Sequence, residues 1–155
     1  MAKVFDFKKM RRVIMIYGVV QLFLVGLLVY MAVHFQAGLL SEGRPQRFLH
    51  SVIATLVIQL ALFYPINRFA AKEAEREVEA CAVGLGVEEL KALRSKRMVG
   101  DVIKAAIFLF FITFIYKAPK DLFILSVIFF SFVLTFLSYF QCYNFSAKRL
   151  MKGKL

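Results

Sequence analysis

The amino-acid sequence predicts an all-α integral membrane fold with four transmembrane helices and a cytoplasmic helical hairpin between the second and the third. Three observations predict it. Hydrophobic residues make up 61% of the 155 residues, and mean hydropathy is +0.71, whereas soluble domains are roughly 45–50% apolar. Four apolar stretches approach or exceed the length of about 20 residues that crossing a bilayer requires. Basic residues gather at alternate ends of these stretches.

A single membrane domain, 1–155, is expected to hold all four spans. The first apolar stretch follows a basic leader, but its 23 residues exceed the apolar region of a signal peptide, which has about 7–15. We therefore expect a retained first helix. The second span carries Pro65 near its inner end. The predicted spans are 13–35, 49–66, 99–116 and 122–145.

The two outer connections differ in length. Residues 36–48 form a loop in which Ser41, Gly43 and Pro45 break any helix. Residues 117–121 are too few for more than a tight turn. The third and fourth spans should therefore form an antiparallel hairpin.

The polar segment 67–98 is expected to be helical on both sides of a turn. Residues 67–83 are rich in Ala, Glu, Lys and Arg, which are strong helix formers, and Gly84 and Gly86 then favour a turn. Glu73 is expected on the surface of the first of these helices. The segment is interpreted as a hairpin standing off the membrane, and the same hairpin could also serve as a docking surface for another subunit.

Orientation follows from the distribution of positive charge. Sixteen of the 21 Lys and Arg residues flank one set of span ends and four flank the other. By the positive-inside rule, both termini and segment 67–98 are cytoplasmic, as in a multi-pass protein of the inner (plasma) membrane. The net charge of +11 is then expected to attract anionic lipid of the inner leaflet. Because these cations flank spans, nucleic acid is not an expected partner.

Asp101 and Lys104 are the only Asp, Glu, Lys or Arg residues within the predicted spans. Their i, i+3 spacing places them on one face at the inner end of the third span. An ionisable residue inside a span is a functional candidate, although Lys104 could instead extend to the interface and be neutralised by Asp101. Both a structural anchor and a functional pair remain open.

Uncharged polar residues recur at helical spacing along the spans. Such stripes let membrane helices approach and hydrogen-bond one another, and they could alternatively line a pathway for an ion or solute. The predicted polar helix face comprises Gln21, Thr55, Gln59, Thr113, Ser131, Thr135 and Ser138.

The histidines raise a cofactor hypothesis. His34 ends the first span and His50 begins the second, so both could be axial ligands of one b-type haem near the outer face. Interfacial histidines are more often simply solvated, and no cofactor is the favoured expectation. Cys81 and Cys142 lie on or near the reducing side, where a disulfide is not expected. No metal-ligand spacing accompanies them.

No nucleophile with a base, phosphate-binding glycine loop or paired catalytic carboxylates is recognisable, so the sequence does not favour an enzyme. The leading hypothesis is a non-enzymatic accessory, assembly or scaffold subunit of a membrane complex, working with other membrane subunits or with copies of itself. A small oligomeric ion channel or solute transporter is the alternative, and a b-type cytochrome is a second one. No acidic residue is expected deep in the membrane, which disfavours a proton or cation pump.

Three short stretches resemble the ATP synthase protein I family of small four-helix bacterial membrane proteins. They are GDVIKAAIFLFF at 100–111, VQLFLVGLL at 20–28 and YPIN at 64–67. The resemblance implies an accessory protein that helps to assemble the rotor ring of the membrane ATP synthase, with a link to magnesium handling. It implies Gly100, Asp101 and Lys104 as the family-matching positions. Segment 67–98 departs from that family's pattern, because it is much longer than the usual short connection.

Overall fold

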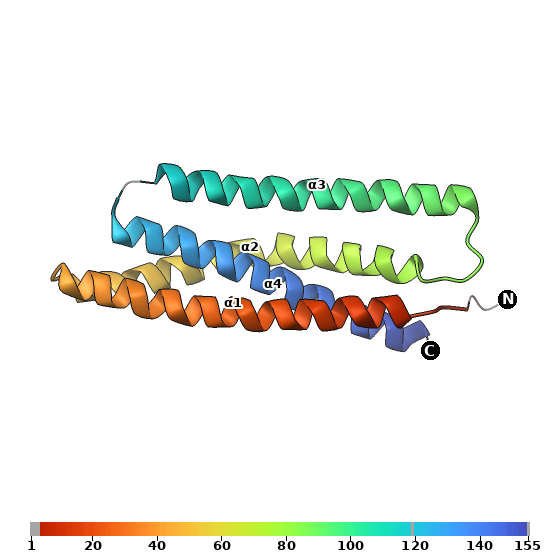
Figure 1. The fold of residues 1–155 in the computed structure, drawn as a ribbon, viewed down its shortest axis with the longest axis horizontal. Coiled ribbons are helices and arrows are strands. Elements are labelled where there is room, and N and C mark those ends of the chain that lie inside the picture. The colour runs from red at the N-terminus through yellow and green to blue at the C-terminus, as the bar shows by residue number, and fades with distance from the viewer. Residues whose placement is uncertain (1–3, 119, 155) are drawn as a thin grey trace.

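Four long α-helices make up almost the whole of a computed structural model, which describes residues 4–118 and 120–154. Successive helices run antiparallel, so that the two ends of the chain and the 80–86 turn lie together at one end of the molecule (Figure 1). We call it the termini end, and the opposite end the far end. The helices are α1 (Lys8–Ser41), α2 (Pro45–Glu79), α3 (Val87–Lys117) and α4 (Leu122–Lys154).

Each helix is long and apolar enough to cross a bilayer, which confirms the prediction of four such helices. All four extend beyond the predicted spans, mainly at the termini end. Charged residues end an apolar stretch without ending the helix that contains it, since Lys, Arg and Glu have high helix propensity. The second helix accordingly continues through the Ala/Glu/Lys/Arg-rich sequence to Glu79, as expected.

The connections at the far end are shorter than predicted. Helix α1 continues to Ser41 and α2 begins at Pro45, so only 42–44 remain of the expected loop. Two of the three predicted breaking residues lie where the chain turns, whereas Ser41 is the last residue of α1. Gly43 has a φ of 73°, a left-handed conformation that glycine adopts without a Cβ penalty. Pro45 occupies the first helical position, where an N–H is not needed.

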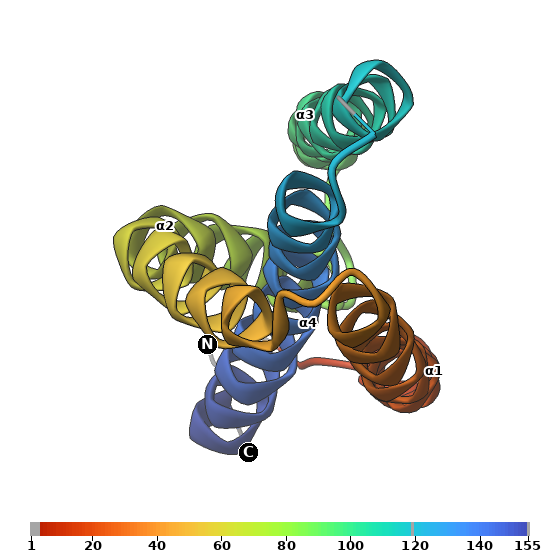
Figure 2. The same ribbon diagram turned by 90° about the vertical axis from the view of Figure 1, so that its left-hand side faces the viewer.

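Helix α4 is the centre of the arrangement. It packs against each of the other three helices (Figure 2). Helices α1 and α2 lie on either side of it, whereas α3 lies outside, against α4 and the termini end of α2. Across residues 4–118 and 120–154, α3 makes no packing contact with α1. The antiparallel pairing of α3 with α4 was predicted, but the outlying position of α3 was not.

The buried apolar core lies at the termini end. Ala70 and Ala74 of α2 and Ala147 of α4 are fully buried, and such small side chains let helix backbones approach closely. The first part of the predicted hairpin is therefore packed into the bundle and does not stand free. Its second part, at the start of α3, leaves Val87 84% exposed. The core also contains Phe7, Met10, Val78, Tyr139, Cys142 and Tyr143.

The chain entering α1 also contacts the 80–86 turn. The backbone N–H of Asp6 donates to the carbonyl of Cys81 at 3.0 Å, and that of Val83 donates to the carbonyl of Val4 at 2.7 Å. These bonds pair main-chain groups of two segments that lie outside the helices. They fix the α2–α3 connection against the start of α1.

Candidate functional site

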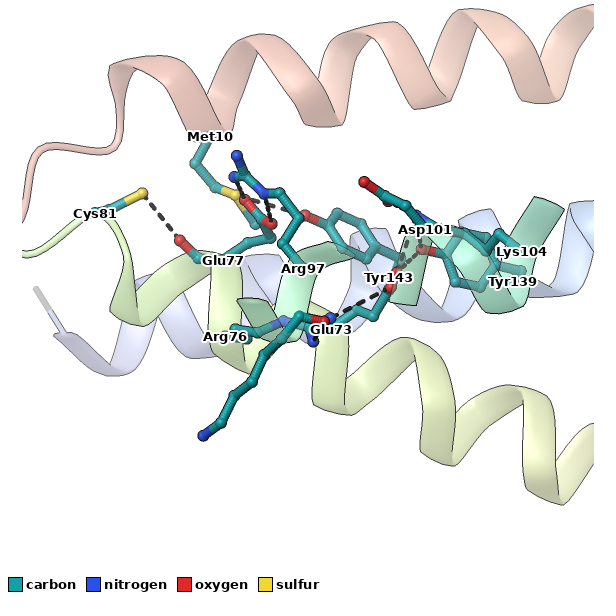
Figure 3. Close-up of polar contacts among 11 residues, drawn as sticks. Met10, Glu73, Arg76, Glu77, Cys81, Arg97, Asp101, Lys104, Tyr139 and Tyr143 are labelled. Carbon is teal, nitrogen blue, oxygen red and sulfur yellow. Dashed lines mark hydrogen bonds and ion pairs between the residues drawn. The ribbon is translucent and has the colours of Figure 1, made fainter. Parts of the chain in front are cut away.

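The predicted pair Asp101 and Lys104 is formed. Lys104 Nζ lies 3.2 Å from Asp101 Oδ1, both on α3 and one turn apart. Asp101 is 62% exposed in its side chain and Lys104 27%. The lysine therefore points into the protein while its local partner remains at the surface (Figure 3).

The inward partner of Lys104 is Glu73 of α2, at 3.2 Å. Its side chain is only 6% exposed, and the expectation that Glu73 lies on the helix surface is wrong. Tyr139 of α4 completes the group, since its hydroxyl donates to Glu73 and accepts from Lys104 Nζ at 3.3 Å. The site thus joins α2, α3 and α4 through one carboxylate, one ammonium and one phenol.

Arg76 supplies a second cation to the same carboxylate. Its Nη2 lies 3.3 Å from Glu73 Oε1, while its Nη1 donates to the main-chain carbonyl of Lys96 on α3. A Cβ at Gly100 would collide with the Glu73 carboxylate. Glycine at this position is therefore what lets the backbone of α3 approach the buried acid.

A bidentate ion pair lies one turn nearer the termini end. Arg97 of α3 donates from Nε to Glu77 Oε1 at 2.7 Å, and from a second guanidinium nitrogen to the other carboxylate oxygen. Paired N–H donors match the two oxygens of a carboxylate, which makes this the strongest geometry for such a contact. With Glu73–Lys104, it attaches the termini end of α3 to α2. We call these two ion pairs and the Arg76 contacts the α2–α3 clasp.

The clasp joins two carboxylates, those of Glu73 and Glu77, to three cations, those of Lys104, Arg76 and Arg97. Buried charges are costly to desolvate, and removing one partner leaves the other uncompensated. Glu73 also lies level with residues that the sequence places inside the third and fourth spans, namely Gly100, Lys104 and Tyr139. Glu73 thus lies near the inner end of those spans, as Asp101 does, and the absence of an acid deep in the membrane stays a prediction.

Lys104 separates two cavities of different character. One, of about 260 Å³, lies between α1 and α3 and is lined by polar groups that include Tyr17, Asp101 and Tyr143. The other, of about 480 Å³, lies between α2 and α3 and is lined almost wholly by apolar side chains. Lys104 lines both. The Lys104 side chain thus lies between a partly polar cavity and an apolar one.

The predicted polar helix face is divided between two interfaces of α4. Gln59 of α2 donates from Nε2 to the carbonyl of Ser131 and to Thr135 Oγ1, both at 3.2 Å. On the other side, Gln21 of α1 donates to Gln141 Oε1 at 2.9 Å. Helix packing therefore accounts for the predicted members Gln21, Gln59 and Thr135. Ser131 contributes only its main-chain carbonyl, and its buried hydroxyl has no partner among the described residues.

The remaining predicted members lie elsewhere. Thr55 is buried and bonds to the carbonyl of Ser51 on its own helix. Ser138 lines a cavity beside Gln21. Thr113 is exposed on α3, where its hydroxyl bonds to the carbonyl of Leu109.

The two histidines are both exposed. His34 stacks on Tyr30, with ring centroids 6.4 Å apart. Neither histidine lines the apolar cavity between α2 and α3. Among the described residues, no group of three or more His, Cys, Asp or Glu side chains could hold a metal ion.

Cys81 lies in the turn after α2, and Cys142 is buried in α4. Both thiols are free. Partial burial raises the pKa of the Cys81 thiol, with the nearby carboxylates of Glu77 and Asp6 acting in the same direction. The Cys81 thiol also donates to the carbonyl of Glu77 at 3.3 Å. A raised pKa makes it a poor nucleophile at neutral pH.

Sequence reasoning missed Glu73 and Tyr139 as members of the site. One pattern could have found Glu73: it lies between Ala70 and Ala74, two small residues at the spacing of a packed helix face. A carboxylate on such a face needs a buried cation. Comparison of the chain with protein-family models, curated proteins and solved structures finds no match.

Proposed function

We propose that this chain is a non-enzymatic accessory subunit of a membrane complex, acting as a scaffold or assembly factor through contacts of α3 with a partner's helix. The observation that carries the proposal is the position of α3, which lies outside the bundle and is attached to it along one side only. A helix so placed has most of its circumference available to another membrane protein.

The outward face of α3 has the composition that membrane helices use for association. Val102, Ala106, Leu109 and Thr113 are all exposed and follow one another at spacings of four, three and four residues, which aligns them along one stripe. Small and weakly polar residues in such a stripe favour close helix contact. Thr113, predicted as part of a polar helix face, belongs to this outward stripe.

In this proposal the termini end faces the cytoplasm of a cell whose inner membrane holds the four helices. Of the sixteen basic residues that flank the spans on one side, the fifteen in the described part of the chain all belong to segments at this end. The positive-inside rule supports the orientation, and anionic lipid of the inner leaflet supplies the counter-charge.

The resemblance to ATP synthase protein I supplies the specific form of the proposal, which is assembly of a rotor ring. Its three matching positions, Gly100, Asp101 and Lys104, belong to the α2–α3 clasp or adjoin it. In this role the clasp would set the angle at which α3 is presented to the partner.

Site-specific photo-crosslinking in native membranes tests the proposal. A benzophenone amino acid replaces Leu109 on the outward stripe of α3, and Leu22, 74% exposed on α1, is the matched control. We expect an adduct of one defined mass from position 109 and none from position 22, with mass spectrometry identifying the partner. Equal labelling at both positions, or none at 109, contradicts the proposal.

The alternative of a channel or transporter predicts a different result. Reconstituted protein would give a selective flux that Gln21→Leu or Gln59→Leu abolishes. The division of these polar residues between two interfaces of α4 is the reason we place this alternative second. A b-type cytochrome would reveal itself by Soret absorbance of the purified protein.

A further inference from the structure

The apolar cavity between α2 and α3 is a cleft on the side of the bundle. It is bounded by Leu62, Ile66 and Phe69 of α2, by Ile103 and Ile107 of α3, and by Phe136 of α4 at its back. Its volume is about 480 Å³. Helix α3 joins α2 only through the clasp at one end and does not close over the rest of the cleft. In a bilayer such a cleft opens to the hydrocarbon.

The cleft is short and apolar. Its α3 wall runs from Ile103 to Phe111, which is about 12 Å at a rise of 1.5 Å per residue. Its lining is almost wholly apolar. A hydrocarbon chain, which has no polar group to satisfy, matches such a lining.

Positive charge lies at the end of the cleft nearest the termini. Lys72 follows the lining residue Phe69 by three positions on α2, and Lys96 precedes Ile103 by two turns on α3, so both continue the faces that line the cleft. Both lysines are exposed. Within the described part of the chain, neither forms an ion pair.

Lys72 and Lys96 belong to the same end of the cleft because of the clasp. Arg76, one turn beyond Lys72, donates to the main-chain carbonyl of Lys96. The two lysines thus flank the point where α2 and α3 meet. An anionic group there would lie near two exposed lysines, at the end of the α2 and α3 faces that line the apolar cleft.

We propose that this cleft is a binding site for an anionic phospholipid, with one acyl chain between α2 and α3 and the phosphate held by Lys72 and Lys96. The site uses the inner sides of α2 and α3, whereas the proposed partner would contact the outward stripe of α3. The lipid site can therefore be tested independently of the accessory function.

Fluorescence quenching tests the site directly, because the chain contains no tryptophan. Phe111→Trp places one indole in the lining of the cleft. Leu109→Trp places one two residues away, at a position 62% exposed on the outer surface of α3, and serves as a depth-matched control. Each variant is reconstituted in phosphatidylcholine, and phosphatidylglycerol with brominated chains is titrated in.

We expect the tryptophan at 111 to be quenched at a much lower fraction of brominated phosphatidylglycerol than the tryptophan at 109. Adding Lys72→Gln and Lys96→Gln should raise the half-quenching fraction at 111 on the order of tenfold, since both phosphate contacts are lost. Adding Lys148→Gln and Lys152→Gln, which remove two exposed lysines of α4 at the same end, should leave it unchanged.

Three results would overturn the proposal. Equal quenching at 111 and 109 would mean that lipid in the cleft is ordinary boundary lipid. An equal effect of the two double lysine substitutions would mean that only the general charge of this end attracts the lipid. Brominated phosphatidylcholine quenching position 111 as efficiently as phosphatidylglycerol would exclude the phosphate contact.

Discussion

Replacing Lys104 with Met should destabilise the protein more than any other single charge removal at the surface of α3. The substitution keeps the length and apolar stem of the side chain, which lines the cleft, and removes only the ammonium. Glu73, 6% exposed, would then keep Arg76 as its sole cation. Its carboxylate would remain buried with half of its counter-charge lost.

The expected magnitude follows from the geometry. Two unit charges 3.2 Å apart attract by about 5 kcal/mol at an effective dielectric constant of about 20. Part of this lost attraction is offset, because the Lys104→Met variant no longer has to bury an ammonium group. Losing one partner of a buried pair costs about 3–5 kcal/mol, and Arg76 at 3.3 Å still compensates Glu73. We therefore expect a loss of about 3 kcal/mol for Lys104→Met.

Reversible unfolding of the detergent-solubilised protein by increasing fractions of SDS, followed by circular dichroism, measures this loss. Lys148→Met is the matched control, since Lys148 is exposed and forms no ion pair with another described residue. It should change the free energy of unfolding by less than about 0.5 kcal/mol.

A double-mutant cycle then tests the cause. Glu73→Gln removes the carboxylate charge, and the double variant with Lys104→Met should be more stable than the sum of the single losses implies, by about 2 kcal/mol. If Lys104→Met costs no more than Lys148→Met, or if the two losses simply add, the ion pair does not hold α3 in place and our reasoning is refuted.

Three further outcomes are expected. Gly100→Ala should destabilise the protein by about 1–3 kcal/mol, because the added methyl group meets the Glu73 carboxylate. Gly18→Ala, with open space around it, should be neutral or slightly stabilising. The same SDS titration compares the two variants. Gln59→Leu should cost about 0.6 kcal/mol, typical of an interhelical hydrogen bond in a membrane, and a loss above about 2 kcal/mol would contradict a simple packing role. Because the pKa of the Cys81 thiol is raised in the folded state, the unfolded chain loses this proton first. The stabilisation of the folded state by this bound proton should therefore be complete below pH about 8.5 and fall as pH rises further. Iodoacetamide should also alkylate Cys81 more slowly than free cysteine at pH 8, as measured in a Cys142→Ser variant.

The helices and the local pair could be predicted from the sequence because both depend on short-range spacing. Apolar length identifies a spanning helix, and an i, i+3 pair such as Asp101 with Lys104 must share a face of any helix that forms. The helix ends were less predictable. Hydropathy falls at the first charges, whereas backbone hydrogen bonding continues through strong helix formers such as those between Arg68 and Glu79.

The contacts between helices could not be predicted, because one sequence does not specify which faces meet. Glu73 follows Asn67 and Arg68 and therefore resembles a solvated position, yet tight packing of its alanine neighbours on α4 buries it. Thr113 shows the converse. It has the spacing of the polar stripe, but α3 turns it outward.

The central position of α4 has a consequence for biosynthesis. A ribosome delivers the helices in chain order, at roughly 5–20 residues per second, so α1, α2 and α3 are made before the helix that packs against all of them. Until α4 arrives, Gln21 and Gln59 lack the acceptors they use in the finished protein. Final packing therefore has to wait for the fourth helix, and a chain truncated before 122 would keep the ion pairs between α2 and α3 but lose the helix that joins α1 and α2 along their length.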